Sequence, residues 1–398
     1  MSNLKPNSKF STFDANMMAR ALALATEGRF STTPNPHVGC VIVSEPHATK
    51  DQFDEAPVII GEGYHERAGL AHAEINAMEQ AVANGHSLKG ASVYVSLEPC
   101  AHVGRTGSCA QALVAARVKK VVVACLDPNP MVAGKGINIL KNAGIDVSIG
   151  LMQSEAQELN KTFFFRIEHG RPFVSVKLAS SLDAKTALAS GESKWITTEQ
   201  ARADVQIERA KACAILTGSG TVLHDNPQLN VRTHQLPSDI AVRFSRRQKQ
   251  PLRVIIDSQN QLSSQQHNIL SDGAPTLVYN IKHNSAIEHE NVEQRQLNSR
   301  GNGQSNIGQK IDLLAMLKDL ACQEINHVWV EAGANLCGAL FEKGLVDELV
   351  VYQAPMILGN NAKDLLKVNA PEFLKDATRF SISELKLVGG DIKIRANL

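Results

Sequence analysis

The sequence is poor in aromatic residues and carries almost no net charge. Phe, Trp and Tyr make up 5% of its 398 residues, with two Trp and four Tyr, and the formal net charge is +1 at pH 7. A domain that binds nucleic acid usually shows a basic surface with interleaved aromatic side chains. We therefore expect no nucleic-acid partner.

Long apolar runs are also missing. No uninterrupted apolar stretch approaches the ~18 residues that a membrane span needs, and residues 1–10 lack the basic start and apolar core of a secretory signal. The cysteines are odd in number and scattered, at Cys40, Cys100, Cys109, Cys125, Cys213, Cys322 and Cys337. Such a set is typical of a reduced protein rather than a disulfide-linked secreted one. We expect a cytoplasmic enzyme with no membrane partner.

The length exceeds that of one hydrophobic core, so two domains are expected. Strands alternate with helices in both halves, and apolar runs such as residues 121–125 indicate buried strands. This pattern predicts an α/β fold, with a mainly parallel sheet in the first half. We place one domain at residues 1–150 and the other at 151–398, with a connecting segment at 151–170.

Local signals mark some of the elements. Ser11 and Asp14 have capping-box spacing, which predicts a helix that ends at Gly28. Thr197 and Gln200 open a second predicted helix in the same way. Residues 44–57 are a polar connection between two strands, and residues 281–310 are polar and rich in Gly, Asn and Gln. We expect the latter to be an exposed segment.

A possible zinc site is spread over three elements of the first half. His72 and Glu74 begin a helix that ends at residues 84–85, Cys100 ends a strand, and Cys109 begins another helix. One imidazole and two thiolates leave a fourth position of Zn²⁺ open, which is typical of catalytic rather than structural zinc. The start of a helix also favours the thiolate form of Cys109.

Zinc in such a site lowers the pKa of bound water to about 7, and Glu74 is then suited to move protons to a leaving ammonia. A His-x-Glu alone is most often a solvated helix start, and a lone Pro-Cys is unremarkable. Together, in this order, they match the zinc-deaminase pattern H-x-E followed by P-C-x-x-C. The difference is that Cys109 follows Cys100 after nine residues instead of three.

The segments PNPHVGCVIV, GYHERAGLAHAE, LEPCAHVGRTGSCAQAL and DPNPMVAGKGINIL resemble the deaminase half of the bifunctional riboflavin-biosynthesis deaminase/reductase family. There the long cysteine spacing, with Gly104-Arg105-Thr106 inside it, is characteristic. The resemblance implies a cytidine-deaminase-like α/β/α domain that binds one Zn²⁺ through His72, Cys100 and Cys109. It also implies that Glu74 is the proton donor.

The same resemblance implies the substrate, a phosphoribosylated diaminopyrimidinone that loses one exocyclic amine. Asn35 falls on the pyrimidine-contacting loop, although a simple Pro-rich turn would give the same sequence. His65 and His102 are interpreted as neighbours of the site, because three ligands are already supplied. Lys135, where arginine is more usual, and the long connection at 44–57 depart from the family pattern without touching the metal chemistry.

The second half lacks GxGxxG and therefore a Rossmann fingerprint. A strand runs through Gly333 into a helix, which suits either an anion site or a tight turn. Arg209 and Arg232 are candidates for bidentate phosphate binding, but an arginine on a helix, such as Arg209, is more often solvated or ion-paired. Trp195 is suited either to stack on a planar ring or to fill the core.

The segments KLASSLDAKTALASGESKWIT, TGSGTVLHDNPQLNVR, VIIDS, VEAGANLCGAL and DELVVYQAPMILG resemble the reductase half of the same family, whose fold is similar to dihydrofolate reductase. The resemblance places NADP at Ala179, Trp195, Thr221, Asp225, Ser258, Gly333, Ala334, Asn335, Leu336, Cys337, Gly338 and Ala339. It places the ribosyl phosphate substrate at Ser193, Arg209, Leu229, Arg232 and Glu331. Ala334-Asn335 replaces the more common Gly/Pro-Thr.

We therefore expect a cytoplasmic enzyme that catalyses two consecutive steps of riboflavin synthesis on a small-molecule substrate. Deamination is followed by NADPH-dependent reduction of the ribosyl chain to ribityl, with hydride supplied by the nicotinamide. α/β domains with exposed apolar edges often pair, so a homo-oligomer is expected. The alternatives are a tRNA base deaminase with an accessory RNA-binding domain, and a structural zinc site joined to a nucleotide-sensing module.

Overall fold

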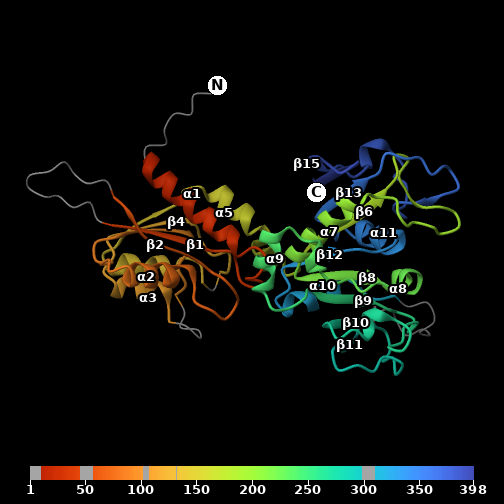
Figure 1. The fold of residues 1–398 in the computed structure, drawn as a ribbon, viewed down its shortest axis with the longest axis horizontal. Coiled ribbons are helices and arrows are strands. Elements are labelled where there is room, and N and C mark those ends of the chain that lie inside the picture. Colours follow the sequence, from red (N-terminus) through yellow and green to blue (C-terminus); the bar gives the residue numbers. More distant parts are fainter. Residues whose placement is uncertain (1–9, 45–56, 102–106, 131, 298–309) are drawn as a thin grey trace, which may run out of the picture. The chain divides into compact units, whose positions relative to one another are not determined.

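The computed structural model describes residues 10–44, 57–101, 107–130, 132–297 and 310–398 (Figure 1). Contacts divide the chain into two compact units. The first contains residues 1–168 with 242–248, and the second contains residues 169–241 with 249–398. Among the described helices, none is long and apolar enough to cross a membrane.

The first unit is built on a five-stranded sheet of order β2-β1-β3-β4-β5. Its strands are β1 Gly39–Val43, β2 Ile59–Tyr64, β3 Ser92–Leu97, β4 Lys120–Cys125 and β5 Asp146–Ile149. β3, β4 and β5 pair in parallel, whereas β1 is antiparallel to both β2 and β3. The expectation of a mainly parallel sheet holds for β2, β3, β4 and β5, which run in one direction, whereas β1 runs against them. A parallel neighbour requires a crossover connection, and the polar residues between β1 and β2 offer no apolar helix face for one.

Helices cover both faces of this sheet (Figure 1). They are α1 Thr12–Glu27, α2 Ala73–Ala83, α3 Cys109–Ala115, α4 Lys135–Asn142, α5 Gln153–Leu159 and α6 Lys161–His169. Side chains alternate along each strand, so Cys40 and Ile42 pack with α2, α3 and α4. Val41 and Val43 pack on the opposite face with α1, α5 and α6.

The predicted capping box of α1 is confirmed. The Ser11 hydroxyl accepts the Asp14 N–H at 3.1 Å, and the Asp14 carboxylate accepts the Ser11 N–H at 2.9 Å. The helix ends at Gly28, as its sequence predicts. The Asp14 carboxylate also accepts hydrogen bonds from Tyr94 on β3 and Lys120 on β4. This cap therefore ties α1 to the centre of the sheet as well as closing its own first turn.

The segment treated above as a connection, residues 151–170, contributes core to the first unit. Leu151, Ala156 and Phe164 are buried in the layer that α1 forms with the sheet. The polar residues that suggested a linker, such as Glu155 and Gln157, occupy the exposed faces of α5 and α6. The contact boundary consequently falls after residue 168.

The second unit contains a nine-stranded sheet of order β11-β10-β9-β8-β12-β6-β13-β16-β15 and a two-stranded sheet of β7 and β14. The bounds are β6 Phe173–Ser180, β7 Lys185–Ala187, β8 Ala214–Gly218, β9 Leu252–Ile256, β10 Thr276–Asn280, β11 Val292–Gln296, β12 His327–Val330, β13 Glu348–Gln353, β14 Lys363–Asp364, β15 Ser381–Val388 and β16 Asp391–Asn397. From β11 to β13 the pairing is parallel throughout, and β16 and β15 add antiparallel strands at one edge.

Helices flank this larger sheet. They are α7 Glu199–Lys211, α8 Ser219–Asp225, α10 Leu313–Cys322 and α11 Ala334–Glu342, with short 3₁₀ turns at Thr233–Gln235, Asn268–Leu270 and Leu374–Asp376. A further helix, α9 Ser238–Ser245, crosses the contact boundary, because residues 242–248 belong to the first unit. The side chain that caps α7 is Thr198, which accepts the Ala201 N–H, so the predicted cap at Thr197 is one residue early.

Part of the segment 281–310 differs from expectation. Residues 292–296 form the edge strand β11, and Ile281 and Ile287 are buried. These two isolated isoleucines are enough to anchor a polar sequence against the sheet. Residues 298–309 lie outside the described residues, as do most residues of the 44–57 connection.

The strand order of the second unit creates a topological switch point. The chain leaves β8 toward β9 on one side, and it leaves the neighbouring β12 toward β13 on the other. In open α/β sheets, ligands bind outside the carboxyl ends of two such strands. The starts of α8 and α11 flank this position, and a Cβ on Gly218 would lie 3.4 Å from the Leu336 side chain. The topology therefore predicts a ligand crevice at this position.

The packing of α6 leads to a stability prediction. Phe164→Ala removes a buried ring from the first unit and should lower its free energy of unfolding by about 3–5 kcal/mol. Denaturant unfolding measures this loss, and Glu155→Ala on the exposed face of α5 is the control. An effect no larger than that of the control would contradict a core role for residues 151–168.

Candidate functional site

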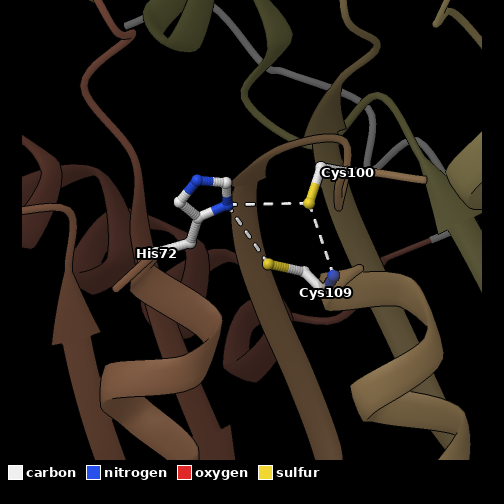
Figure 2. A group of neighbouring side chains, drawn as sticks. All are labelled: His72, Cys100 and Cys109. Atoms are coloured by element: carbon white, nitrogen blue, oxygen red, sulfur yellow. Dashed lines mark hydrogen bonds between the residues drawn. The ribbon is translucent and has the colours of Figure 1, made fainter. Parts of the chain in front are cut away.

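His72 occupies the N-cap position of α2. Its backbone is extended, with φ −77° and ψ 165°, and its side chain makes no capping hydrogen bond. The imidazole is therefore not used by the helix, and it turns toward Cys100, which follows β3, and Cys109, which begins α3 (Figure 2). The predicted helix starts are confirmed at His72 and Cys109, whereas β3 ends at Leu97, three residues before the predicted strand end at Cys100.

The three side chains converge at metal-ligand separations. His72 Nδ1 lies 3.3 Å from Cys109 Sγ and 3.6 Å from Cys100 Sγ (Figure 2). All three donor atoms lie within 4.8 Å of one another. Zn–N and Zn–S bonds in a tetrahedral site place neighbouring donors about 3.5–3.8 Å apart. The donor set and its spacing therefore fit zinc.

The glycine at position 63 allows α2 to approach the sheet closely. A Cβ at Gly63 would lie 2.5 Å from the Ala73 carbonyl oxygen and 2.5 Å from the Ala77 nitrogen. No side chain fits in that space, so only glycine lets the first turn of α2 rest on β2. The position of His72 at the start of this helix depends on that contact.

Hydrogen bonds join the two cysteines across their nine-residue gap. Ser108, the N-cap of α3, accepts the Gln111 N–H and donates to the Cys100 carbonyl at 2.8 Å. The Cys109 N–H points at Cys100 Sγ at 3.3 Å. The start of α3 is thereby fixed against the end of β3. His102 and residues 104–106, which lie within the gap, fall outside the described residues.

The two thiols influence each other's ionisation. Hydrogen bonding from Cys109, followed by that from His72, lowers the pKa of Cys100 to about 4. The same contact with Cys100, together with burial, raises the pKa of Cys109. Two thiolates this close repel each other, so the first to ionise hinders the second. A divalent cation between them would stabilise both charges.

Glu74 lies in the first turn of α2, two residues after His72, and its side chain is only 3% exposed. Burial raises its pKa to about 7, against smaller lowering effects that include a hydrogen bond with Cys109. A carboxyl group with such a pKa, in contact with a metal ligand, is suited to accept and return a proton near neutral pH.

The loop that contains Asn35 also reaches this site. The Asn35 amide nitrogen lies 3.0 Å from His65 Nε2, and the His65 ring packs edge-on against His72 with centroids 5.3 Å apart. Neither Asn35 nor His65 contributes to the metal-ligand group found among the described residues. The prediction that His65 is a neighbour and not a ligand is consistent with this geometry.

Asn160, at the junction of α5 and α6, binds the backbone of His37 in the loop that contains Asn35. Its side-chain oxygen accepts the His37 N–H at 2.7 Å, and its side-chain nitrogen donates to the His37 carbonyl at 2.9 Å. The side chain is almost fully buried. The loop is therefore supported by a residue 123 positions later in the chain, which sequence patterns did not single out.

The residues predicted to bind NADP gather near the switch point of the second unit. Ala179 ends β6, Thr221 lies in α8, Ser258 follows β9, and residues 333–339 open α11. All these strands are parallel, so their carboxyl ends lie along one edge of the sheet. Asp225 is exposed at the end of α8.

Trp195 does not fill the core, because its side chain is 67% exposed. The Arg202 guanidinium lies 4.2 Å from the centre of the indole ring, and the Arg202 side chain also donates to the Thr197 carbonyl. A cation on one face leaves the tryptophan suited to stack a planar group on the other. Ser193, two residues earlier, is partly buried.

Arg209 and Glu331 bind each other. Arg209 Nε and Nη2 donate to the two Glu331 oxygens at 2.6 and 2.9 Å, and Nη1 donates to the Asn230 carbonyl. The planar fork of Arg209 holds a carboxylate here, which agrees with the ion-paired alternative, and its contact with the substrate stays a prediction. The ion pair, together with burial, fixes the position of Glu331.

Arg232 differs from Arg209 in each respect. Its side chain is exposed, and the hydrogen bond it shares with Gln206 uses its backbone N–H. Its guanidinium therefore remains available to an anion. Leu229, in the same loop, is buried and has a positive φ of 49°.

Lys177 on β6 was missed in the sequence. Burial lowers its pKa, while the neighbouring Glu331 raises it. A lysine among the apolar residues of FVSVKLAS was the available signal, since a buried strand rarely carries a charge without a purpose. It places a cationic group beside Glu331 at the predicted reductase site.

Two family models match the chain. Residues 11–125 match the cytidine and deoxycytidylate deaminase zinc-binding region, and residues 172–394 match the RibD C-terminal domain. Among curated relatives, the riboflavin biosynthesis protein RibD of Escherichia coli is 46% identical over 381 residues, covering 95% of this chain and 98% of the relative. RibD of Haemophilus influenzae is 43% identical over 388 residues, covering 97% and 98%.

Solved structures agree over the same length. Acinetobacter baumannii RibD is 42% identical with a TM-score of 0.82, covering 96% of this chain and 98% of that one. A diaminohydroxyphosphoribosylaminopyrimidine deaminase/5-amino-6-(5-phosphoribosylamino)uracil reductase from Thermotoga maritima is 29% identical with a TM-score of 0.80 and the same coverages. The expected pairing of a deaminase-like and a reductase-like domain is thereby confirmed.

The ligand geometry predicts how metal binding responds to substitution. Cys109→Ser should weaken zinc binding by more than about 100-fold, because changes outside the ligand shell already cost about 10- to 100-fold. Metal content after dialysis against a chelator measures the effect. Cys322→Ser, at an exposed cysteine far along the chain, should retain zinc like the unmodified protein. Full retention by Cys109→Ser would remove this residue from the ligand set.

Proposed function

The chain belongs to the RibD family of bifunctional riboflavin-biosynthesis enzymes, and we propose how its own residues divide the family's two activities. The protein is a zinc-dependent deaminase and an NADPH-dependent reductase. Deamination is assigned to the first domain and reduction to the second, with the boundary between residues 150 and 170. Its substrate for deamination is assigned as 2,5-diamino-6-ribosylamino-4(3H)-pyrimidinone 5′-phosphate.

The convergence of His72, Cys100 and Cys109 beside a buried Glu74 carries the deaminase assignment. A bound zinc ion would act as a Lewis acid that makes water nucleophilic at neutral pH. Glu74 takes a proton from the water and delivers it to the departing exocyclic nitrogen, which leaves as ammonia while a carbonyl replaces it on the ring. Asn35 holds the pyrimidine in place.

The reductase assignment rests on the crevice at the β8–β12 switch point. Bound NADPH would supply hydride to C1 of the opened ribose. Residues 333–339, through the backbone N–H groups at the start of α11, hold the cofactor together with Ala179, Thr221, Asp225 and Ser258, and the exposed ring of Trp195 stacks against it. The substitution Ala334-Asn335 leaves these backbone donors in place.

On the substrate side of that crevice, Arg232 binds the phosphate. Ser193, Leu229 and Glu331 complete the pocket, and Arg209 acts through Glu331 by holding its carboxylate. Lys177 adds positive charge beside that carboxylate. This division gives the two arginines different tasks.

The alternatives are less well supported. A tRNA base deaminase with an accessory domain does not account for the two RibD relatives, whose similarity covers 95% and 97% of the chain. A structural zinc site would not need a buried carboxyl group with its pKa raised to about 7 next to His72. Ammonia release from the diaminopyrimidine phosphate, followed by NADPH oxidation with the deaminated product, tests the two activities separately.

We also infer a cytoplasmic homo-oligomer that binds small molecules rather than nucleic acid or membranes. Zinc-binding thiols such as Cys100 and Cys109 function in their reduced form, as cytoplasmic conditions allow. An apolar strip on β15 and β16 supports self-association. It consists of Leu385, Leu387, Ile392 and Ile394, which share one face because Leu385 pairs with Ile394 and Leu387 with Ile392.

The first functional prediction concerns Glu74. Glu74→Gln should keep one zinc per chain but lower the rate of deamination by at least about 100-fold, because the amide cannot carry the proton. Ammonia release and metal content are measured on the same sample. NADPH oxidation with the deaminated substrate serves as the control and should be unchanged. Unimpaired ammonia release would remove Glu74 from the mechanism.

A second prediction separates the two arginines. Arg232→Gln should raise KM for the phosphorylated reductase substrate about 10- to 100-fold, the range expected when a charged hydrogen bond is lost. KM for the same compound without its phosphate should not change. If both compounds are affected equally, Arg232 does not bind the phosphate.

The third prediction tests the apolar strip. Leu385 and Leu387 are 66% and 76% exposed, and replacing both with lysine should shift the protein toward monomers in sedimentation velocity. Leu374→Lys, at an exposed leucine outside β15, is the control. A double variant that sediments like the control would argue against association through this strip.

A further inference from the structure

The side-chain amide of Asn35 has a nitrogen that donates hydrogen bonds and an oxygen that accepts them, and the nitrogen is held by His65. We propose that His65 is a positioning residue that turns the amide oxygen of Asn35 toward the pyrimidine. The inference rests on the proposed role of Asn35 in substrate binding. It assigns His65, which is neither a zinc ligand nor a proton carrier here, a part in selecting the substrate.

The hydrogen bonds of His65 define its tautomer. Nδ1 lies 3.0 Å from the Ala71 carbonyl oxygen, which can only accept a hydrogen bond, so Nδ1 carries a proton. Nε2 lies 3.0 Å from the Asn35 amide nitrogen, which can only donate. Nε2 is therefore unprotonated, and His65 is neutral.

The His65 ring is itself held firmly. It is 3% exposed, and its backbone N–H donates to the Val38 carbonyl at 2.9 Å. The contact with Ala71 ties it to the residue before the ligand His72, and its ring packs edge-on against the His72 ring. A ring fixed at these points presents its Nε2 lone pair in one direction only.

This arrangement determines which end of Asn35 is free. The nitrogen end is used by His65, while the amide oxygen has no hydrogen-bond partner among the described residues. The loop backbone is fixed as well, because the Asn35 N–H donates to the Thr32 carbonyl and Asn160 holds both polar backbone groups of His37. The site therefore offers the ligand a hydrogen-bond acceptor at this point.

An acceptor at this point selects the chemical class of the ligand edge. A pyrimidine edge that carries an amino group or a ring N–H can donate to the Asn35 oxygen. An edge that carries only acceptors would place its own oxygen or unprotonated nitrogen against the Asn35 oxygen, with no hydrogen between them. The diaminopyrimidinone has donors of both kinds. By fixing the rotation of the ring in its plane, this contact also influences which exocyclic amine is presented to Glu74.

A double-mutant cycle tests the inference on the full-length, zinc-loaded enzyme. His65→Phe keeps a ring of similar shape but removes both hydrogen bonds, and it should raise KM for the diaminopyrimidine phosphate about 10- to 100-fold with a smaller change in kcat. In an Asn35→Ala background the same substitution should change KM less than about twofold, because its target is already gone. Effects that multiply in the double variant would overturn the inference.

A conservative variant distinguishes positioning from simple packing. The amide of His65→Gln can donate to the Ala71 carbonyl through its nitrogen and accept from Asn35 through its oxygen, so it should recover most of the loss in KM. His65→Phe fits the packing equally well but should not. Equal KM values for the two variants would contradict a role through hydrogen bonding.

The controls separate this inference from the proposed function. Zinc content and NADPH oxidation should stay unchanged in every variant, which excludes loss of the fold or the metal. If Asn35→Ala alone leaves KM unchanged, Asn35 does not bind the substrate and the inference fails with that assignment, although deamination itself would stand. If Asn35→Ala raises KM and His65→Phe does not, only the role of His65 is refuted.

Discussion

The deaminase half depends on bringing one imidazole and two thiols from separate elements to within 4.8 Å of one another. His72 begins α2, Cys100 follows β3 and Cys109 begins α3, so an error in packing any of these elements would open the site. Gly63 lets α2 rest directly on β2, and Ser108 ties the start of α3 to Cys100. The apolar residues of α2, α3 and the sheet pack around the contact of Gly63 with α2 and the hydrogen bond of Ser108 to Cys100.

In the second unit, strand order and a buried ion pair determine the expected ligand position. Its expected ligand position is set by topology, because the chain leaves the neighbouring strands β8 and β12 in opposite directions. A buried ion pair lies in the same unit. Arg209 uses both ends of its fork to hold the Glu331 carboxylate, and Lys177 adds a second positive charge near it.

Features that depend on neighbouring residues were predictable from sequence. The capping box at Ser11 and the helix start at His72 follow from short spacings, and the group of His72, Cys100 and Cys109 follows from two short motifs taken in order, H-x-E and P-C with a later cysteine. Features that depend on distant partners were not. The carboxylate that occupies Arg209 lies 122 residues away, and the antiparallel placement of β1 is decided by which strands become its neighbours. Lys177 was detectable, since it is the one charged residue of β6.

The two hydrogen bonds between Asn160 and the His37 backbone affect where the chain could be divided into separate deaminase and reductase proteins. The Asn160 amide supplies the donor and acceptor that a neighbouring strand would otherwise provide, so the loop that carries Asn35 is completed by a residue well beyond Cys109. The motifs that identify the deaminase are therefore shorter than the piece of chain that builds it. A gene that split these activities, or fused them anew, would have to keep α5 and α6 with the zinc-binding half.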